Sequence, residues 1–146
     1  MKIAVSACLL GHNCKYNGSN NRNQAVIDYV APHEVVPVCP EKLGGLPIPR
    51  APAEIVDGVV MNAEGESVDG QFRRGARRAL DIVQRAGVDC AILQPRSPSC
   101  GVHQVYDGTF SGTLIEGEGV FARLLREHRI KTYEPDELTD LADASR

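Results

Sequence analysis

The sequence predicts one α/β domain in which helices cover both faces of a mainly parallel sheet. Short apolar runs alternate with amphipathic segments, a pattern typical of parallel strands joined by crossover helices. The apolar runs are Lys2–Ala7, Glu34–Val38, Val88–Leu93 and Ile130–Tyr133. The helical segments are residues 24–30, 70–86, 120–128 and 137–144. We therefore expect a single three-layer α/β/α domain over residues 1–146, with a Rossmann-like sheet.

The clearest helix is expected from Gly70 to Ala86. Apolar residues from Phe72 to Val83 recur at three- and four-residue spacing, which places them on one helix face. Asp69 is the expected N-cap and Gly87 the expected stop signal. The opposite face carries a row of arginines, which we interpret as a solvated surface.

The connections between these elements differ in character. Residues 11–23 are rich in Asn and Gly and predict a loop, and the proline-rich residues 43–52 predict irregular structure. Residues 55–68 carry β-branched side chains around Asn62–Gly65 and predict a small hairpin there. Residues 102–118 are glycine-rich and give no clear element.

Composition excludes several classes of protein. A hydrophobic content of 42% with 24% charged residues is typical of a soluble globular domain. A net charge of −3 argues against sequence-independent binding to nucleic acid, so nothing strongly supports a nucleic-acid partner. No apolar run approaches the roughly 20 residues of a membrane span, and the first residues are a poor secretion signal. We expect a cytoplasmic protein whose five cysteines stay reduced.

Three of the cysteines recur at corresponding places in the pattern. We place Cys8, Cys39 and Cys100 each directly at the end of an apolar run that predicts a strand. The carboxyl ends of parallel strands share one sheet edge, so the three thiols are expected to converge in a crevice there. Three converging thiolates predict a metal or iron–sulfur site with a vacant position for chemistry.

Other interpretations of the thiols differ in their support. A closed zinc site formed by Cys8, Cys14, Cys39 and Cys100 is possible, although the two-residue spacing of zinc knuckles is missing. A sulfur carrier or redox partner protein would use the same thiols without a metal. A cysteine phosphatase is excluded, because Cys14 stands where the phosphate-clamping arginine would be needed.

A series of short segments along most of the chain resembles the thiouracil desulfurase family of bacterial and archaeal proteins. The segments are Ser6–Gly11, Tyr16–Gly18, Pro37–Glu41, Gly44–Leu46, Pro49–Arg50, Ser97–Gly101, Tyr106–Gly108 and Gly117–Val120. Their order along the chain is that of the family.

The resemblance implies a [4Fe-4S] cluster held by Cys8, Cys39 and Cys100, with one iron left open to the sulfur of a small thiolated base such as 2-thiouracil. It implies a hydrolytic reaction without net electron transfer, in which water adds at carbon and hydrosulfide leaves. Glu41 is the candidate general acid/base and Ser99 the candidate residue for positioning substrate or water. Ser97 and Arg50 are further candidates for contacts with the substrate.

Overall fold

A computed structural model of the chain describes residues 1–144. Residues 145 and 146, the end of the predicted 1–146 domain, lie outside the described residues. The central sheet has four parallel strands in the order β2-β1-β5-β8. These are β1 (Lys2–Ser6), β2 (Glu34–Val38), β5 (Cys90–Ile92) and β8 (Lys131–Tyr133). The predicted mainly parallel α/β sheet is confirmed.

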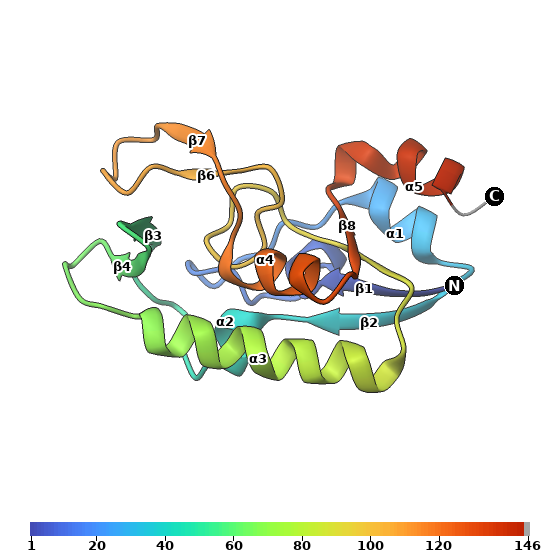
Figure 1. Cartoon of the computed structure of the whole chain (residues 1–146), viewed down its shortest axis with the longest axis horizontal. Helices are drawn as coiled ribbons and strands as arrows, with labels where there is room; N and C mark the ends of the chain where they lie inside the picture. Colours follow the sequence, from blue (N-terminus) through green and yellow to red (C-terminus); the bar gives the residue numbers. More distant parts are fainter. Residues whose placement is uncertain (145–146) are drawn as a thin grey trace.

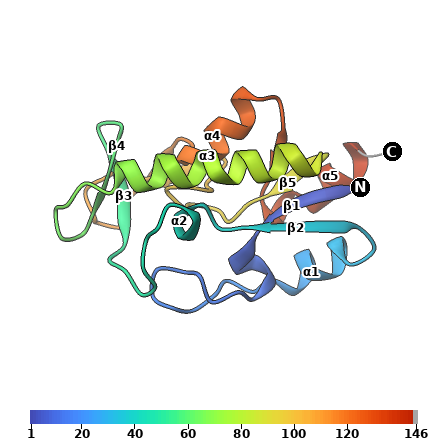
Figure 2. The same cartoon turned by 90° about the horizontal axis from the view of Figure 1, so that it is seen from below.

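Helices cover both faces of this sheet. Successive β1 side chains point to opposite faces, so apolar residues on each face pack against helices on that side. Ala4 packs with apolar residues of α3 (Asp69–Ala86) and α4 (Val120–Glu127). Ile3 and Val5 pack with α1 (Gln24–Val30) and α5 (Leu138–Ala144). Figure 2 shows α3 and α1 on opposite sides of the strands. One apolar core therefore lies on each side of the sheet, which gives the predicted three layers.

Two antiparallel hairpins extend beyond the carboxyl ends of the parallel strands, on the left of Figure 1. One consists of β3 (Ala53–Val56) and β4 (Val59–Asn62), and the other of β6 (Gln104–Tyr106) and β7 (Leu114–Glu116). The sequence did not predict β6 and β7, because three-residue strands in a glycine-rich segment carry almost no periodic signal.

The predicted hairpin around Asn62–Gly65 is present only as a short antiparallel bridge between Met61 and Ser67, and the regular β3–β4 hairpin precedes it. The tight turn of the β3–β4 hairpin falls at Asp57–Gly58, where both residues have positive φ angles of 49° and 80°. This suits a two-residue connection between twisted strands. The Asn62 side chain instead accepts the backbone N–H groups of Glu64 and Glu66, forming a second turn after β4.

Two further details of the fold differ from expectation. The predicted N-cap role of Asp69 is wrong, because α3 begins at Asp69 itself and its carboxylate accepts the Val60 N–H. A one-turn helix that was not predicted, α2 (Pro40–Leu43), follows β2 directly. Within residues 1–144, no helix is long and apolar enough to cross a membrane.

Candidate metal centre and catalytic site

A cavity of about 590 Å³ opens at the carboxyl ends of the parallel strands. Cys8, Cys39 and Cys100 all line it, and Cys14 is a fourth thiol on its wall. All four are free cysteines, with Cys14 and Cys100 buried and the other two half-buried. The predicted convergence of the three thiols on one crevice is therefore what the structure shows.

Each thiol is held by a different local device. Cys8 lies in a 3₁₀ turn, Ala7–Leu10, that follows β1 directly and ends at Gly11 in the left-handed region. Cys39 is the N-cap residue of α2, with Pro40 at the first helical position, where its missing N–H costs nothing. These two cysteines sit at strand ends, as the sequence suggested.

Cys100 reaches the cavity differently. It lies well beyond the end of β5, in a loop that folds back toward the strand ends, so it is not at a strand end itself. Ser97 organises this loop, because its Oγ accepts the N–H groups of Ser99 and Cys100 at 3.1 and 3.0 Å. Gly119 packs against the loop so closely that a Cβ there would lie 2.5 Å from Ser99 backbone atoms.

The surroundings divide the thiols by acidity. Burial raises the pKa of Cys8, and it raises the pKa of Cys100 to about 12. Cys39 differs, because its interaction with the Cys14 side chain and the backbone N–H of Lys42 lower its pKa to about 7. The same interaction, with burial, raises the pKa of Cys14.

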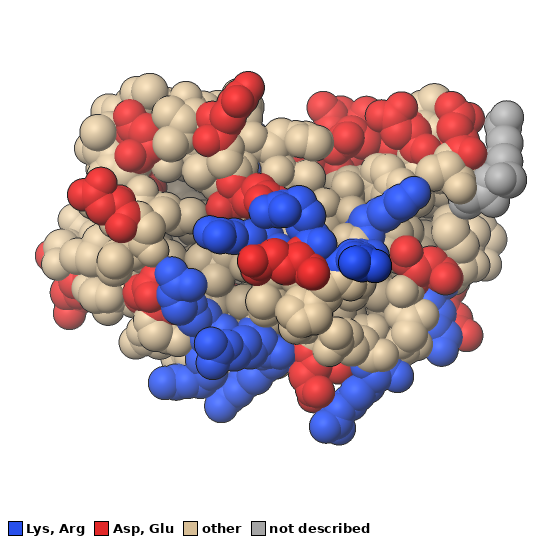
Figure 3. All heavy atoms as spheres, in the orientation of Figure 1, with Lys and Arg blue, Asp and Glu red and all other residues tan. Residues whose placement is uncertain are grey.

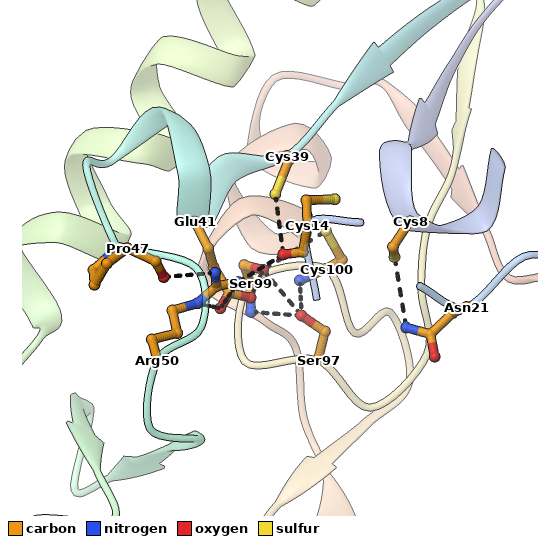
Figure 4. A network of polar contacts seen from close by, with 10 residues as sticks. All are labelled: Cys8, Cys14, Asn21, Cys39, Glu41, Pro47, Arg50, Ser97, Ser99 and Cys100. Atoms are coloured by element: carbon orange, nitrogen blue, oxygen red, sulfur yellow. Dashed lines mark hydrogen bonds and ion pairs between the residues drawn. The ribbon is translucent and has the colours of Figure 1, made fainter. Parts of the chain in front are cut away.

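Glu41 lies beside these thiols in a network of polar contacts (Figure 4). The Arg50 guanidinium donates to its Oε1 through Nε and Nη2, at 3.2 and 3.1 Å. The Ser99 hydroxyl donates to Oε2 at 2.9 Å and lies 3.7 Å from the Cys100 sulfur. The ion pair is largely buried, with 8% of the Arg50 side chain and 18% of the Glu41 side chain exposed.

The network gives Arg50 and Ser97 clear structural partners. Arg50 also donates to the carbonyl oxygens of Cys14 and Pro47, so its guanidinium ties the cavity wall to Glu41. Ser97 Oγ lies 2.9 Å from Ser99 Oγ. Substrate contacts by these two residues stay predictions, because their polar atoms already have protein partners.

Sequence reasoning assigned no individual role to several residues of the cavity. The Asn21 amide lies 3.6 Å from the Cys8 sulfur, and Tyr16, Tyr106 and Phe110 line the walls. They come from loops and a hairpin without periodic pattern, so only chain folding brings them to the site. His103, the histidine nearest Cys100 in sequence, instead bonds Glu137, 2.7 Å away.

The donor set fits a group larger than a single ion. Tetrahedral zinc with Zn–S bonds of ≈ 2.3 Å would bring its sulfurs to about 3.8 Å from one another. Within residues 1–144, no three cysteine sulfurs lie within 4.8 Å of one another. Soft thiols on three separate loops around one cavity suit a polynuclear iron–sulfur group.

Fold and site together define an α/β domain with a thiol-rich cavity at the carboxyl edge of its sheet. The sequence profile of a protein family described as 2-thiouracil desulfurase matches residues 3–137. The chain belongs to the 2-thiouracil desulfurase family, as the sequence resemblance indicated.

Two relatives are similar along nearly their whole length. The uncharacterized protein YbbK of Bacillus subtilis (strain 168) is 38% identical over 149 residues, covering 95% of this chain and 99% of YbbK. A solved structure described as the [4Fe-4S]-dependent thiouracil desulfidase TudS (DUF523Vcz) is 40% identical, with a TM-score of 0.92. The match covers 98% of this chain and 96% of that structure.

Proposed function

We propose that this chain is a [4Fe-4S]-dependent desulfurase that removes sulfur from a small thiolated nucleobase such as 2-thiouracil. The observation that carries the proposal is one cavity that joins Cys8, Cys39 and Cys100 to the carboxylate of Glu41 and the hydroxyl of Ser99. Family membership and the similarity to TudS support the same activity.

In this proposal Cys8, Cys39 and Cys100 hold the cluster. When bound, the cluster supplies an iron without a protein ligand that acts as a Lewis acid toward the substrate's sulfur. The protein contributes thiolates, an N–H donor from Asn21 beside the Cys8 sulfur, and a largely apolar cavity wall.

The residues of the chain then supply proton transfer. In the Glu41 carboxylate, Oε1 accepts hydrogen bonds from Arg50, and Oε2 accepts one from the Ser99 hydroxyl. That oxygen can take a proton from water as it adds to the carbon that bears sulfur, and can return it as hydrosulfide leaves. The balance is thione plus water giving carbonyl plus hydrogen sulfide, without oxidation or reduction.

The test is a measurement of iron, acid-labile sulfide and turnover on protein purified without oxygen. We expect about four iron and four sulfide per chain, and one sulfide released for each 2-thiouracil converted to uracil. Zinc in place of iron would contradict the proposal in favour of a structural zinc protein. A protein-bound persulfide without stoichiometric iron would favour a sulfur carrier.

A further inference from the structure

Aromatic side chains gather at the cavity. The chain has three Phe and four Tyr residues and no Trp. Phe72 and Phe121 are buried in the core, but Tyr16, Tyr106 and Phe110 line the cavity. Tyr16 and Phe110 are also 40% and 39% exposed. These rings are exposed in a cavity and are not buried in the core. Aromatic side chains exposed in a cavity are typical of surfaces that bind ligands.

Phe110 is held in an uncommon backbone conformation. Its φ angle is 56°, in the left-handed region that a bulky L-residue rarely adopts. Glu54 stabilises this conformation, because its Oε1 accepts the N–H groups of Gly108 and Phe110 at 3.0 and 3.1 Å. Asp107 further accepts the Thr109 N–H at 2.9 Å. The turn that carries Phe110 is therefore fixed from both sides.

The Glu54 contacts also join the two hairpins that face each other in Figure 1. Glu54 belongs to β3, whereas Gly108 and Phe110 lie in the turn between β6 and β7. A Cβ at Gly108 would lie 2.6 Å from the carbonyl oxygen of Ile55, so the backbones approach closely there. This contact sets the Phe110 ring on the wall of the cavity that also contains the thiols.

We propose that Phe110 is the platform on which the ring of the substrate stacks, and that Glu54 is the residue that positions it. The inference rests on the proposed desulfurase function and deepens it. It assigns flat heteroaromatic thiones as the substrate class, in preference to open-chain thioamides such as thioacetamide. An aromatic face stacks on any flat base, so other residues of the cavity must recognise the polar groups of the substrate ring.

The first test uses the absence of tryptophan. Phe110→Trp places a single fluorescent reporter on the proposed platform, and Ile115→Trp places one on β7, on a residue that is exposed and outside the cavity lining. We expect 2-thiouracil and uracil to change the emission of Phe110→Trp saturably and to leave Ile115→Trp unchanged. Equal responses of the two reporters, or no response from either, would overturn the inference.

The second test compares substrates in Phe110→Ala. Loss of one stacking contact weakens binding of a base by roughly 5- to 150-fold, so the KM for 2-thiouracil should rise by that factor and more than kcat falls. The kcat/KM for thioacetamide should fall much less. Glu54→Ala should reproduce the KM effect, and the double variant should be no worse than Phe110→Ala alone, because Glu54 acts through Phe110.

The outcomes separate this inference from the proposed function. A wild-type protein with a full cluster that converts no thione contradicts the proposed function itself. If the wild-type protein converts 2-thiouracil but Phe110→Ala lowers kcat/KM equally for both substrates, the proposed function stands and the role of Phe110 as a platform is refuted. Iron content and far-UV circular dichroism of each variant exclude a folding defect as the cause.

Discussion

At the residue scale, three unrelated loop structures bring three thiols and one carboxylate into a common cavity. Cys8 lies in a 3₁₀ turn, Cys39 at the N-terminus of α2, and Cys100 in a loop tied by Ser97. Glu41 is oriented from two sides, by Arg50 and by Ser99. Each residue can therefore be removed separately to test one role.

Replacement of Cys39 by Ala tests the ligand assignment. We expect iron and sulfide content to fall to near zero while the fold is retained, because Cys39 is half-buried and lies outside the two apolar cores. The matched control is Cys90→Ala, since Cys90 is buried within β5, away from the cavity lining, and should leave iron content unchanged. Full iron retention by Cys39→Ala would refute its role as a ligand.

Replacement of Glu41 by Gln tests the acid/base assignment. Glutamine has the same shape and its amide oxygen can still accept from Arg50, so iron content and stability should change little. Without a carboxylate to move the proton, kcat for 2-thiouracil should fall by roughly 10²- to 10⁴-fold. Glu127→Gln, on the surface of α4, is the control. A kcat for Glu41→Gln within a factor of two of the wild-type value would eliminate Glu41 as the proton-transfer group.

At the element scale, the position of Glu41 depends on how closely α2 approaches α3. Gly44 and Gly75 lie at the crossing, and a Cβ on Gly75 would overlap the carbonyl oxygen of Pro40. Arg78 of α3 donates to the carbonyl oxygen of Leu43 at 2.7 Å and so satisfies the end of α2. The short helix that carries Glu41 is thus held by its contact with the long one.

Gly75→Ala tests this crossing. The added methyl group must push α2 away, so we expect a loss of about 1–3 kcal/mol in the free energy of unfolding, with reduced kcat because Glu41 moves. Gly70→Ala in the same helix is the matched control. Its Cβ would meet nothing within 4 Å, and it should not destabilise the protein. Urea unfolding curves of the two variants measure the difference, and equal stabilities would contradict the close crossing.

At the scale of the whole molecule, the most visible charge feature is the row of basic side chains on α3. On the face shown in Figure 3, Lys and Arg side chains lie along the lower edge, over α3, and both signs mix at the centre. Several α3 arginines are paired within the molecule, Arg73 with Asp69 and Arg85 with Asp81. This agrees with the interpretation of the arginine row as a solvated face. Another polar contact, between His103 and Glu137, joins residues that lie far apart in the sequence.

The His103–Glu137 contact predicts a pH-dependent contribution to stability. The Glu137 carboxylate raises the pKa of His103 above its ordinary value of 6.5. The contribution is therefore complete below about pH 6.5 and is lost as pH rises through the higher pKa of the folded state. His103→Gln should lower the free energy of unfolding at about pH 5.5 by less than about 1 kcal/mol, because the histidine side chain is 57% exposed.

The same measurement at about pH 8.5 provides the comparison, because a neutral His103 pairs weakly with the carboxylate. The difference between wild type and His103→Gln should shrink there. In a Glu137→Gln background it should be small at both pH values. A destabilisation that is the same at both pH values would show that His103 contributes by packing instead of by charge.

Much of the fold could be read from the sequence because periodic patterns report burial directly. The continuous apolar run of β1 predicts a strand buried on both faces, and the spacing from Phe72 to Val83 predicts the buried face of α3. The convergence of Cys8 and Cys39 also followed from the sequence, since the carboxyl ends of parallel strands lie at one edge of the sheet. The strand-end rule does not explain Cys100, which joins them through the loop tied by Ser97. Their assignment as cluster ligands stays a prediction.

The sequence alone thus determined the fold class, the layers and the place of Cys8 and Cys39 at the sheet edge, because each depends on local pattern and on general rules of parallel sheets. Tertiary structure decided the rest. The Arg50–Glu41–Ser99 network, the crossing of α2 on α3 and the joining of two hairpins by Glu54 each connect residues far apart in the chain. No periodicity encodes such contacts. They depend on the path of irregular loops, which only the folded chain specifies.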